Sequence, residues 1–395
     1  MIRPRLLLLL PVIFLLNFSA AAQQAPLPRV IDLKASDGTV LKASYFAAAK
    51  PGPGVLLLHQ CNRQRKVWDE LAGQLALSGI SVLTFDLRGF GESGGERFDK
   101  LKPQEIGQIQ TEKWPGDIDL AFQYLVSQPG VTRDVIGLGG ASCGVNNSVQ
   151  TARRHPGEVK SLVLLSGGTD LAGRRFLRER SQLPELFALA DDDEFAPTLS
   201  YVPWLFSVAS SPGKKYVHYA KGGHGADIFG VHPELRSVIV DWYVTTLIKM
   251  PGQAPPEKST EPALQSSQIL SEIEMPGGVE TVAAKLAEAR RGDPKAEIFP
   301  EAIVNVMGYE HMQAGDTKYA LEIMKLNVTA YPESPNAYDS LSDAYLADGQ
   351  KEPARQNAQK AMELLASDTI DPPARRDAIR ENAQLKLKQL GEAQP

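Results

Sequence analysis

Residues 140–144 read Gly-Ala-Ser-Cys-Gly, and this stretch decides the fold because it places a serine between two glycines. An apolar run at 135–138 precedes the stretch, and a segment of helical character at 145–154 follows it. In so sharp a turn, side chains two residues before and after the serine would collide, and glycine avoids the collision. The G-x-S-x-G pattern therefore predicts a strand–turn–helix unit that exposes the hydroxyl of Ser142 above the end of a buried strand.

Strand-like and helix-like segments alternate between about residues 23 and 250. Two alternating runs, 29–35 and 39–46, flank Asp37-Gly38, which is a hairpin signal. Continuous apolar runs, typical of strands buried on both faces, then alternate with helical stretches. We expect strands at 55–59, 81–86, 135–138, 159–166, 186–189 and 215–220, and helices at 67–77, 118–126, 145–154 and 233–248. This order predicts a mostly parallel sheet with helices on both faces.

Residues 1–22 have the character of a secretory signal peptide. Arg3 and Arg5 precede an apolar run at 6–16, and small residues end at Ala22. The apolar run is shorter than the ~20 residues that span a bilayer. We therefore expect cleavage after Ala22, a periplasmic or secreted mature protein, and no stable membrane insertion.

The composition argues against nucleic acid as a partner and against a disulfide scaffold or a structural zinc site. The 395 residues are 43% hydrophobic and 23% charged, and the net charge of -5 offers no basic surface for nucleic acid. The two cysteines, Cys61 and Cys143, are too few for a disulfide scaffold or a structural zinc site. No metal or cofactor is expected.

Three segments make residues 29–250 resemble the α/β-hydrolase family, in the branch of dienelactone-hydrolase-like and serine-aminopeptidase-like proteins. They are Leu-Leu-Leu-His-Gln at 56–60, Asp-Leu-Arg-Gly-Phe-Gly-Glu-Ser at 86–93, and the G-x-S-x-G pattern. The resemblance implies an α/β-hydrolase fold in which a nucleophile, an acid and a histidine follow one another along the chain. At the oxyanion loop, His59-Gln60 stands where the family usually has His-Gly.

A serine hydroxyl needs a neighbouring base, and the base needs an orienting acid. The acid is expected in the acidic run that follows the strand at 186–189. The family places it four residues before a proline, here Pro197, which selects Asp193. Asp191 is nearer the strand end, and Asp170 follows the preceding strand; both remain alternatives.

His224 is the expected base. It lies in the glycine-rich loop 221–225, between the last strand and the closing helix, where the family carries its catalytic histidine. The glycines allow the ring to fold over the sheet edge. His232, beyond this loop, is the runner-up. Of three further histidines, His59 is expected in the oxyanion loop, His155 at the end of the helix after the serine, and His218 inside the last strand.

The oxyanion hole is expected to use two main-chain N–H groups. One belongs to Cys143, the residue after the nucleophile, and the other to Gln60 or Cys61. A nucleophilic Cys143 is the competing interpretation. This interpretation is disfavoured because a nucleophilic Cys143 would need glycine two residues before and two residues after it, where the chain has Ala141 and Val145.

The two cysteines could also be bonded to each other. In the α/β-hydrolase fold that the chain resembles, their segments face each other across the oxyanion hole, and export would favour a disulfide. Two buried thiols, acting as small apolar side chains, are the alternative.

The chain after Met250 has a different character. Residues 251–267 are rich in Pro, Gln, Glu and Ser and predict a linker. In the helical region 268–395, Gly315 and Gly349 are 34 residues apart, which resembles tetratricopeptide repeats at about 301–334 and 335–368. The helix at 279–290 would supply a preceding half-unit, and an unrelated helical bundle is the alternative. Such repeats bind a protein partner or pack on the catalytic region.

Together these features predict an exported serine hydrolase that cleaves an ester through an acyl-enzyme on Ser142. A small ester or a short peptide is the expected substrate, because residues 167–185 are too few for a large lid. The alternatives are a serine peptidase of the aminopeptidase type and a non-catalytic protein that binds through its helical repeats. The linker further predicts that residues 23–250 retain activity when separated from the repeats.

Overall fold

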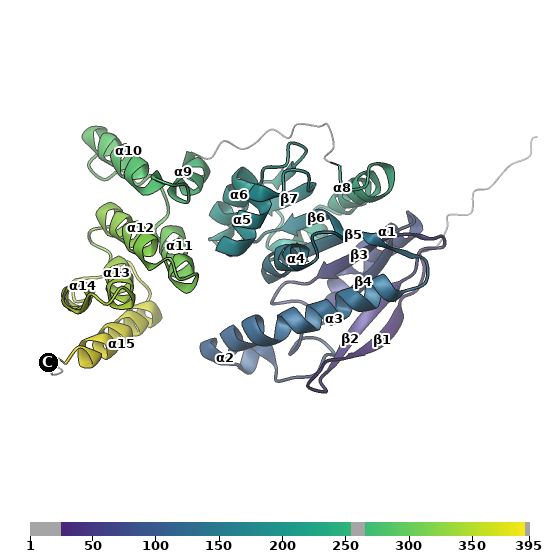
Figure 1. The fold of residues 1–395 in the computed structure, drawn as a ribbon, viewed down its shortest axis with the longest axis horizontal. Helices are drawn as coiled ribbons and strands as arrows, with labels where there is room; N and C mark the ends of the chain where they lie inside the picture. The colour runs from purple at the N-terminus through teal and green to yellow at the C-terminus, as the bar shows by residue number, and fades with distance from the viewer. Residues whose placement is uncertain (1–24, 254–264, 392–395) are drawn as a thin grey trace, which may run out of the picture.

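The computed structural model describes residues 25–253 and 265–391 (Figure 1). The predicted signal peptide lies outside the described residues, as does most of the predicted linker. The described chain has two parts, a sheet covered by helices and a region made only of helices.

One eight-stranded sheet organises the first part, in the order β1-β2-β4-β3-β5-β6-β7-β8. Strand β2 runs antiparallel to β1 and β4, and every neighbouring pair from β4 to β8 is parallel. The strands are β1 (Arg29–Lys34), β2 (Val40–Phe46), β3 (Gly52–Leu58), β4 (Ser81–Phe85), β5 (Val131–Ala141), β6 (Val159–Leu165), β7 (Glu185–Ala190) and β8 (Lys215–Tyr219). The mostly parallel sheet predicted from the sequence is confirmed.

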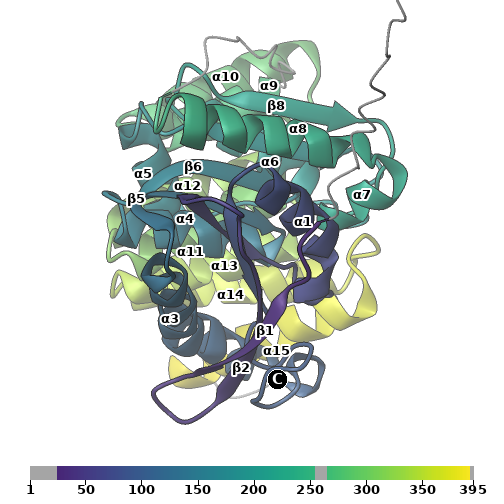
Figure 2. The ribbon, with the colours of Figure 1, turned by 90° about the vertical axis from the view of Figure 1, so that its right-hand side faces the viewer.

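Helices cover both faces of the sheet, and the alternation along β3 shows why. Leu56 and Leu58 enter an apolar cluster with α3 and α4, whereas Val55 and Leu57 enter another with α1 and α8. Helices α1 and α8 lie on the side nearest the viewer in Figure 2. The helices are α1 (Asp69–Leu77), α2 (Pro103–Gln108), α3 (Trp114–Ser127), α4 (Cys143–Arg154), α5 (Leu171–Glu179), α6 (Thr198–Val208), α7 (Ile228–Val231) and α8 (Glu234–Tyr243), with 3-10 turns η1 (Arg65–Trp68), η2 (Phe98–Lys100) and η4 (Gly225–Asp227) and π-helical turns η3 (Ile109–Lys113) and η5 (Val244–Lys249).

The second part is entirely helical among its described residues. It contains α9 (Gln265–Ile273), α10 (Gly278–Gly292), α11 (Glu301–Gln313), α12 (Thr317–Ala330), α13 (Pro335–Ala347), α14 (Lys351–Leu365) and α15 (Pro373–Gln389). The pair α13–α14 begins 34 residues after the pair α11–α12, at both of its helices. Gly315 and Gly349 follow the first helix of each pair with φ values of 81° and 77°, a conformation that favours glycine.

The two parts share an apolar core. Trp204 and Val208 of α6 belong to the same buried cluster as Ile269 of α9, Val282 of α10 and Ile303 of α11. Of the two roles considered for the helical region, packing on the catalytic region is therefore the one that the structure shows. The linker predicts two parts that can be separated, but in the structure the helical region packs directly on α6 of the first part.

None of the described helices combines the length and the apolar character needed to cross a bilayer.

Candidate active site

Ser142 lies at the turn between β5 and α4 in a strained conformation, with φ 52° and ψ -120°. A Cβ atom on Gly140 would collide with the carbonyl oxygen of Gly144, and one on Gly144 would collide with the carbonyl oxygen of Leu58. The steric role predicted for both glycines is confirmed. The backbone strain at this turn holds the serine hydroxyl out from the sheet.

Asp193 and His224 meet although they come from different loops. The Nδ1 atom of His224 lies 2.9 Å from both carboxylate oxygens of Asp193, and both side chains are buried. The amide of Phe195 also donates to Asp193, at 2.8 Å. This arrangement fixes the imidazole ring with Nδ1 toward the carboxylate, so that Nε2 is left for another partner.

The neighbouring aspartates have other partners. Asp191 is exposed and lies 2.7 Å from Nε2 of His218. Asp192 accepts hydrogen bonds from the amides of Gly222 and Gly223, at 2.7 and 2.9 Å, and the Gly223 amide lowers the pKa of this carboxyl. Asp192 therefore orders the loop that carries His224, while Asp193 contacts the ring itself.

The remaining alternatives are held elsewhere. Asp170 caps α5 by accepting a hydrogen bond from the amide of Gly173, at 2.9 Å. His232 stacks on Tyr219 with ring centroids 3.8 Å apart, and its Nε2 lies 2.9 Å from the carbonyl oxygen of Lys221. Neither residue takes part in the Asp193–His224 pair.

Ser142 and His224 line one cavity of about 660 Å³. Its lining includes the aromatic side chains of Phe98, Phe195 and Tyr201. This volume is in the range of pockets for small ligands. No hydrogen bond joins Ser142 to His224 within the described part of the chain, and such catalytic contacts are often long until substrate binds.

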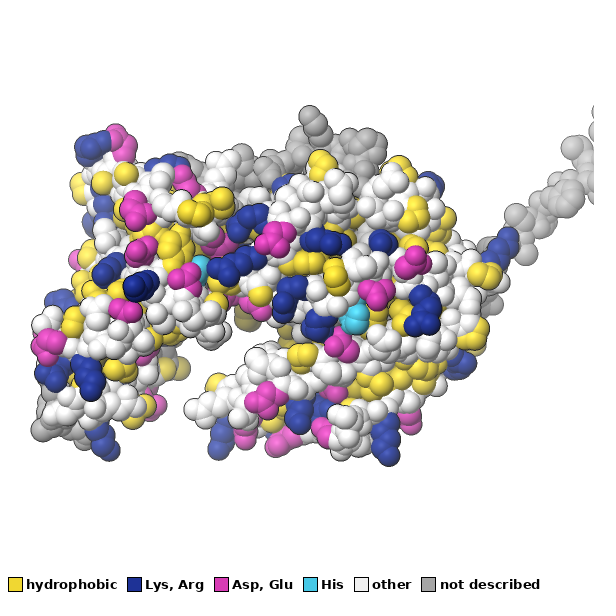
Figure 3. Space-filling view, in the orientation of Figure 1, with side chains coloured by type: hydrophobic (Ala, Val, Ile, Leu, Met, Phe, Trp, Pro, Cys, Tyr) yellow, Lys and Arg dark blue, Asp and Glu magenta, His cyan; other side chains and the backbone are white. Residues whose placement is uncertain are grey.

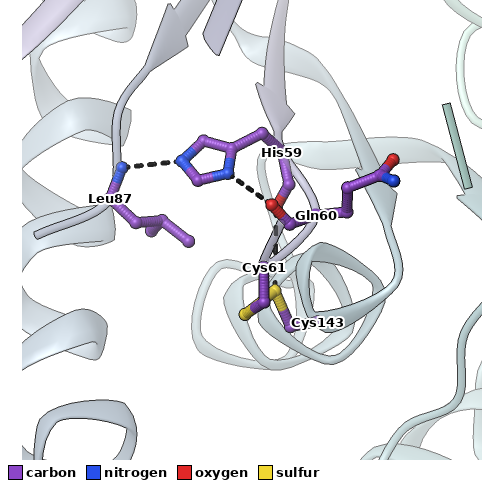
Figure 4. Close-up of a disulfide and its surroundings, with 5 residues drawn as sticks. All are labelled: His59, Gln60, Cys61, Leu87 and Cys143. Atoms are coloured by element: carbon purple, nitrogen blue, oxygen red, sulfur yellow. Dashed lines mark hydrogen bonds between the residues drawn. A yellow bond between two sulfur atoms is a disulfide. The ribbon is translucent and has the colours of Figure 1, made fainter. Parts of the chain in front are cut away.

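His59 braces the oxyanion loop from inside the protein. Its ring is fully buried, Nε2 accepts a hydrogen bond from the Leu87 amide at 3.0 Å, and Nδ1 lies 2.8 Å from the carbonyl oxygen of Gln60 (Figure 4). Burial lowers the pKa of His59, which favours the neutral ring. A neutral ring that accepts at Nε2 donates from Nδ1, so both contacts are satisfied.

The side chain of Gln60 has a role that sequence reasoning missed. Its Nε2 donates to the carbonyl oxygen of His224 at 3.1 Å, and its Oε1 accepts from the amide of Ala226 at 2.7 Å. Glutamine at the position where related proteins usually have glycine thus fastens the loop that carries His224. Of the two residues predicted for the second oxyanion donor, Cys61 lines the cavity and Gln60 does not.

Cys61 and Cys143 form a disulfide, with their Cα atoms 5.9 Å apart (Figure 4). The bond joins the loop after β3 to the first residue of α4. Both cysteines also line the cavity. Within residues 25–253 and 265–391, neither the main-chain N–H of Cys61 nor that of Cys143 donates a hydrogen bond to a carbonyl group. Both predicted donors are therefore available to a negatively charged oxygen.

Glu310 is a cavity residue that sequence reasoning also missed. It comes from α11 of the helical region, yet it lines the same cavity as Ser142. No sequence signal marks this residue, because its position depends on how the helical region packs against α5 and α6. Within the described ranges, no group of three or more His, Cys, Asp or Glu side chains could hold a metal ion.

Comparison with known proteins gives partial matches in sequence. Residues 49–185 match the family model described as serine aminopeptidase, S33. The chain is 32% identical to thiohydrolase aneE of Aspergillus aculeatus, over 27% of this chain and 31% of the relative. It is also 32% identical to an uncharacterized 31.7 kDa protein of Escherichia coli, over 34% and 44%, and to an uncharacterized protein of Mycobacterium tuberculosis, over 39% and 50%. The chain thus covers half or less of the length of these relatives.

Solved structures are similar to somewhat more than half of the chain. Est1E from Butyrivibrio proteoclasticus, with ferulic acid bound, has a TM-score of 0.44 and 17% identity, and the match covers 55% of this chain and 99% of that one. Dienelactone hydrolase from Anabaena variabilis has a TM-score of 0.43 and 19% identity, with 56% and 99% covered. The strand order and the strained serine between β5 and α4 show that the first part of this chain has the α/β-hydrolase fold.

Proposed function

We propose that this protein is a serine hydrolase that cleaves a carboxylic ester through an acyl-enzyme on Ser142. The observation that carries the proposal is the buried Asp193–His224 pair, which lies on the same cavity as the strained serine. The family model that matches residues 49–185 is described as serine aminopeptidase, S33, and the name of one partial relative is thiohydrolase. Both names are consistent with acyl transfer to a serine.

In the proposed reaction, Nε2 of His224 takes the proton from Ser142 Oγ as this oxygen attacks the ester carbonyl carbon. The resulting oxyanion accepts hydrogen bonds from the amides of Cys61 and Cys143. His224 returns the proton to the leaving alkoxide oxygen, and the acyl group stays on the serine. Water, deprotonated by His224, then attacks the acyl carbon. The bond between this carbon and Ser142 Oγ breaks, His224 returns the proton to Oγ, and the carboxylic acid leaves. Asp193 accepts the hydrogen bond from Nδ1 of His224 and orients the ring throughout.

A peptidase of the aminopeptidase type is the alternative within the same chemistry, and the description of the matching family model favours it. It would use the same acyl-enzyme with an amine as leaving group. An ester remains our first choice, because an alkoxide leaves more readily than an amine. A non-catalytic binding protein would have no need of a buried carboxylate–histidine pair beside a strained serine.

A fluorophosphonate probe tests the proposal directly. Wild-type protein should be labelled on Ser142, and the Ser142→Ala variant should not be labelled. Hydrolysis of p-nitrophenyl esters and of aminoacyl anilides then separates esterase from peptidase activity. Absence of labelling in folded wild-type protein would exclude a serine hydrolase and leave the binding protein as the better interpretation.

We also propose that the protein acts after export, in the periplasm or outside the cell. The pattern of residues 1–22 supports this location, and a disulfide such as Cys61–Cys143 persists mainly in oxidising compartments. N-terminal sequencing of protein recovered outside the cytoplasm should begin at Gln23.

We further infer that α11–α14 are tetratricopeptide-like repeats, because the two helix pairs repeat with a period of 34 residues. In this proposal the repeats bind a segment of a protein partner.

A further inference from the structure

Glu310 links the helical region to the candidate active site. Its side chain lies on the wall of the cavity that contains Ser142 and His224. In the space-filling view, the surface is hollowed between the helical region and the end of α2 (Figure 3). Ile106 of α2 and Gln110 of η3 line the cavity on that other side. The helical region thus occupies one side of the substrate-binding space.

A buried ion-pair network holds this wall in place. Arg174 of α5 is 1% exposed, and its Nη2 lies 2.6 Å from a carboxylate oxygen of Glu274 and 2.6 Å from Oε2 of Glu310. Arg178 adds a contact of 3.1 Å to the other oxygen of Glu274. The Arg174 guanidinium also lies 4.2 Å from the ring centre of Trp204, in the core shared by both parts. These contacts fix the position of Glu310 relative to Ser142.

The cavity carries negative charge. Its described lining includes the carboxylates Asp170, Glu194 and Glu310, and it includes no lysine or arginine. Behind the wall, Arg174 contacts both Glu274 and Glu310, and Arg178 contacts Glu274, so two guanidinium groups face a total of four carboxylates and the site keeps an excess of negative charge. In a partly enclosed space such charges act more strongly on a ligand than they would in open water.

Glu310 also keeps a free acceptor atom. Its Oε2 accepts from Arg174, and no described residue donates a hydrogen bond to its Oε1. Burial raises the pKa of this carboxyl, and the Arg174 guanidinium opposes that shift. Aromatic rings at Phe98, Phe195 and Tyr201 complete the walls. Carboxylates combined with aromatic faces are the surroundings that favour an organic cation.

We propose that the helical region is a fixed wall of the active-site cavity, and that through Glu310 it selects esters whose acyl part carries a positive charge over esters that carry a carboxylate. This inference rests on the proposed hydrolase function. It assigns a specificity role to a residue that lies outside the α/β-hydrolase part of the chain.

Three p-nitrophenyl esters of similar length test this preference in the full-length protein. The 4-(trimethylammonio)butanoate and the 5,5-dimethylhexanoate have the same shape and differ by one positive charge, and the glutarate monoester carries a negative charge. After correction for their rates with hydroxide, kcat/KM of the cationic ester should exceed that of its neutral isostere by about tenfold, or ~1.4 kcal/mol. The anionic ester should be the poorest substrate.

The Glu310→Gln variant should lower the ratio of cationic to neutral kcat/KM toward one. It removes the negative charge of Glu310 and leaves Arg174 with Glu274 as its one remaining carboxylate partner in this network. Glu301→Gln, on the same helix but away from the cavity, is the matched control and should keep the wild-type ratio. If Glu310→Gln does not fold, Glu310→Asp takes its place, because its shorter side chain draws the carboxylate back from the cavity and should also lower the ratio.

The two proposals fail in different ways. Equal hydrolysis of the three esters by wild-type protein, or preference for the anionic ester, would overturn the specificity role and leave the hydrolase function in place. An unchanged ratio in folded Glu310→Gln would overturn the role of this residue. No turnover of any ester, together with no fluorophosphonate labelling, would overturn the hydrolase function on which the inference rests.

Discussion

Gln60 and His224 are 164 residues apart in the chain, yet the side-chain amide of Gln60 donates a 3.1 Å hydrogen bond to the carbonyl oxygen of His224. The adjacent residue, Cys61, is bonded to Cys143 beside the serine. One hydrogen bond and one disulfide therefore connect the loops that follow β3, β5 and β8. This cross-linking places the proposed base, nucleophile and oxyanion donors in one rigid frame.

The Gln60 contact should matter for turnover. Gln60→Leu keeps a similar volume but removes both hydrogen bonds to the base loop, so kcat should fall by about 10- to 100-fold through misplacement of His224. Gln64→Leu, in the same segment at an exposed position, is the control and should have little effect. A change in KM alone, with kcat unchanged, would show that Gln60 does not position the base.

The proposed triad predicts a distinct order among the aspartate variants. Ser142→Ala and His224→Ala should each reduce kcat by roughly 10⁴- to 10⁶-fold, and Asp193→Asn by roughly 10³- to 10⁴-fold, with melting temperatures near that of the wild type. Asp191→Asn should change kcat only slightly, because Asp191 contacts His218. If Asp191→Asn proved the damaging change, the assignment of the acid would be wrong.

The fold was predictable because its signals are local. Buried strands appear as continuous apolar runs, and the two glycines around Ser142 report a turn that excludes a Cβ atom. The pairing of Asp193 with His224 could be anticipated from chain order in a family that the sequence resembles. These inferences needed only short segments and the sequence in which they occur.

The remaining parts of the site depend on contacts between distant segments. The side chain of Gln60 reaches the base loop only once β3 and β8 belong to one sheet. Glu310 reaches the cavity only because α11 packs beside α5, which carries Arg174. No pattern near either residue reports these contacts, so the sequence could not assign a role to either side chain.

The disulfide should be present in the native enzyme and should affect both stability and turnover. Native protein treated with an alkylating agent should gain no adducts, and reduced, denatured protein should gain one at each cysteine, as measured by mass spectrometry. Replacing both residues, Cys61→Ala with Cys143→Ala, should cost about 2–4 kcal/mol in the free energy of unfolding. It should also lower kcat, because the two oxyanion donors are no longer held together. Two alkylated cysteines in the native enzyme would exclude the bond.

Glu185 should make stability depend on pH. Its side chain at the start of β7 is fully buried without a hydrogen-bond partner among the described residues, and burial raises its pKa well above 4.5. Above this pH the unfolded chain releases the proton while the folded protein keeps it, so stability falls by up to about 1.4 kcal/mol per pH unit until the pH reaches the folded pKa.

Glu185→Gln removes this titration and keeps the side-chain shape. Its melting temperature, relative to the wild type, should therefore rise as the pH increases above about 4.5, until the pH passes the folded pKa of Glu185. Glu179→Gln, at an exposed position nearby, should show no such trend. A constant difference between Glu185→Gln and the wild type across this range would show that Glu185 does not titrate with folding.

Removal of the helical region should destabilise the catalytic part, despite the linker between them. A protein that ends at Gln253 would expose Trp204 and Val208 of α6 and would remove Glu274 and Glu310, the ion-pair partners of Arg174. Burial of apolar surface contributes about 25 cal/mol per Å², so the truncated protein should melt at a lower temperature, and loss of the cavity wall should lower its esterase activity. Residues 265–395, co-expressed as a separate chain, should restore both properties. Full stability and activity of the truncated protein alone would show that the shared core contributes little to either.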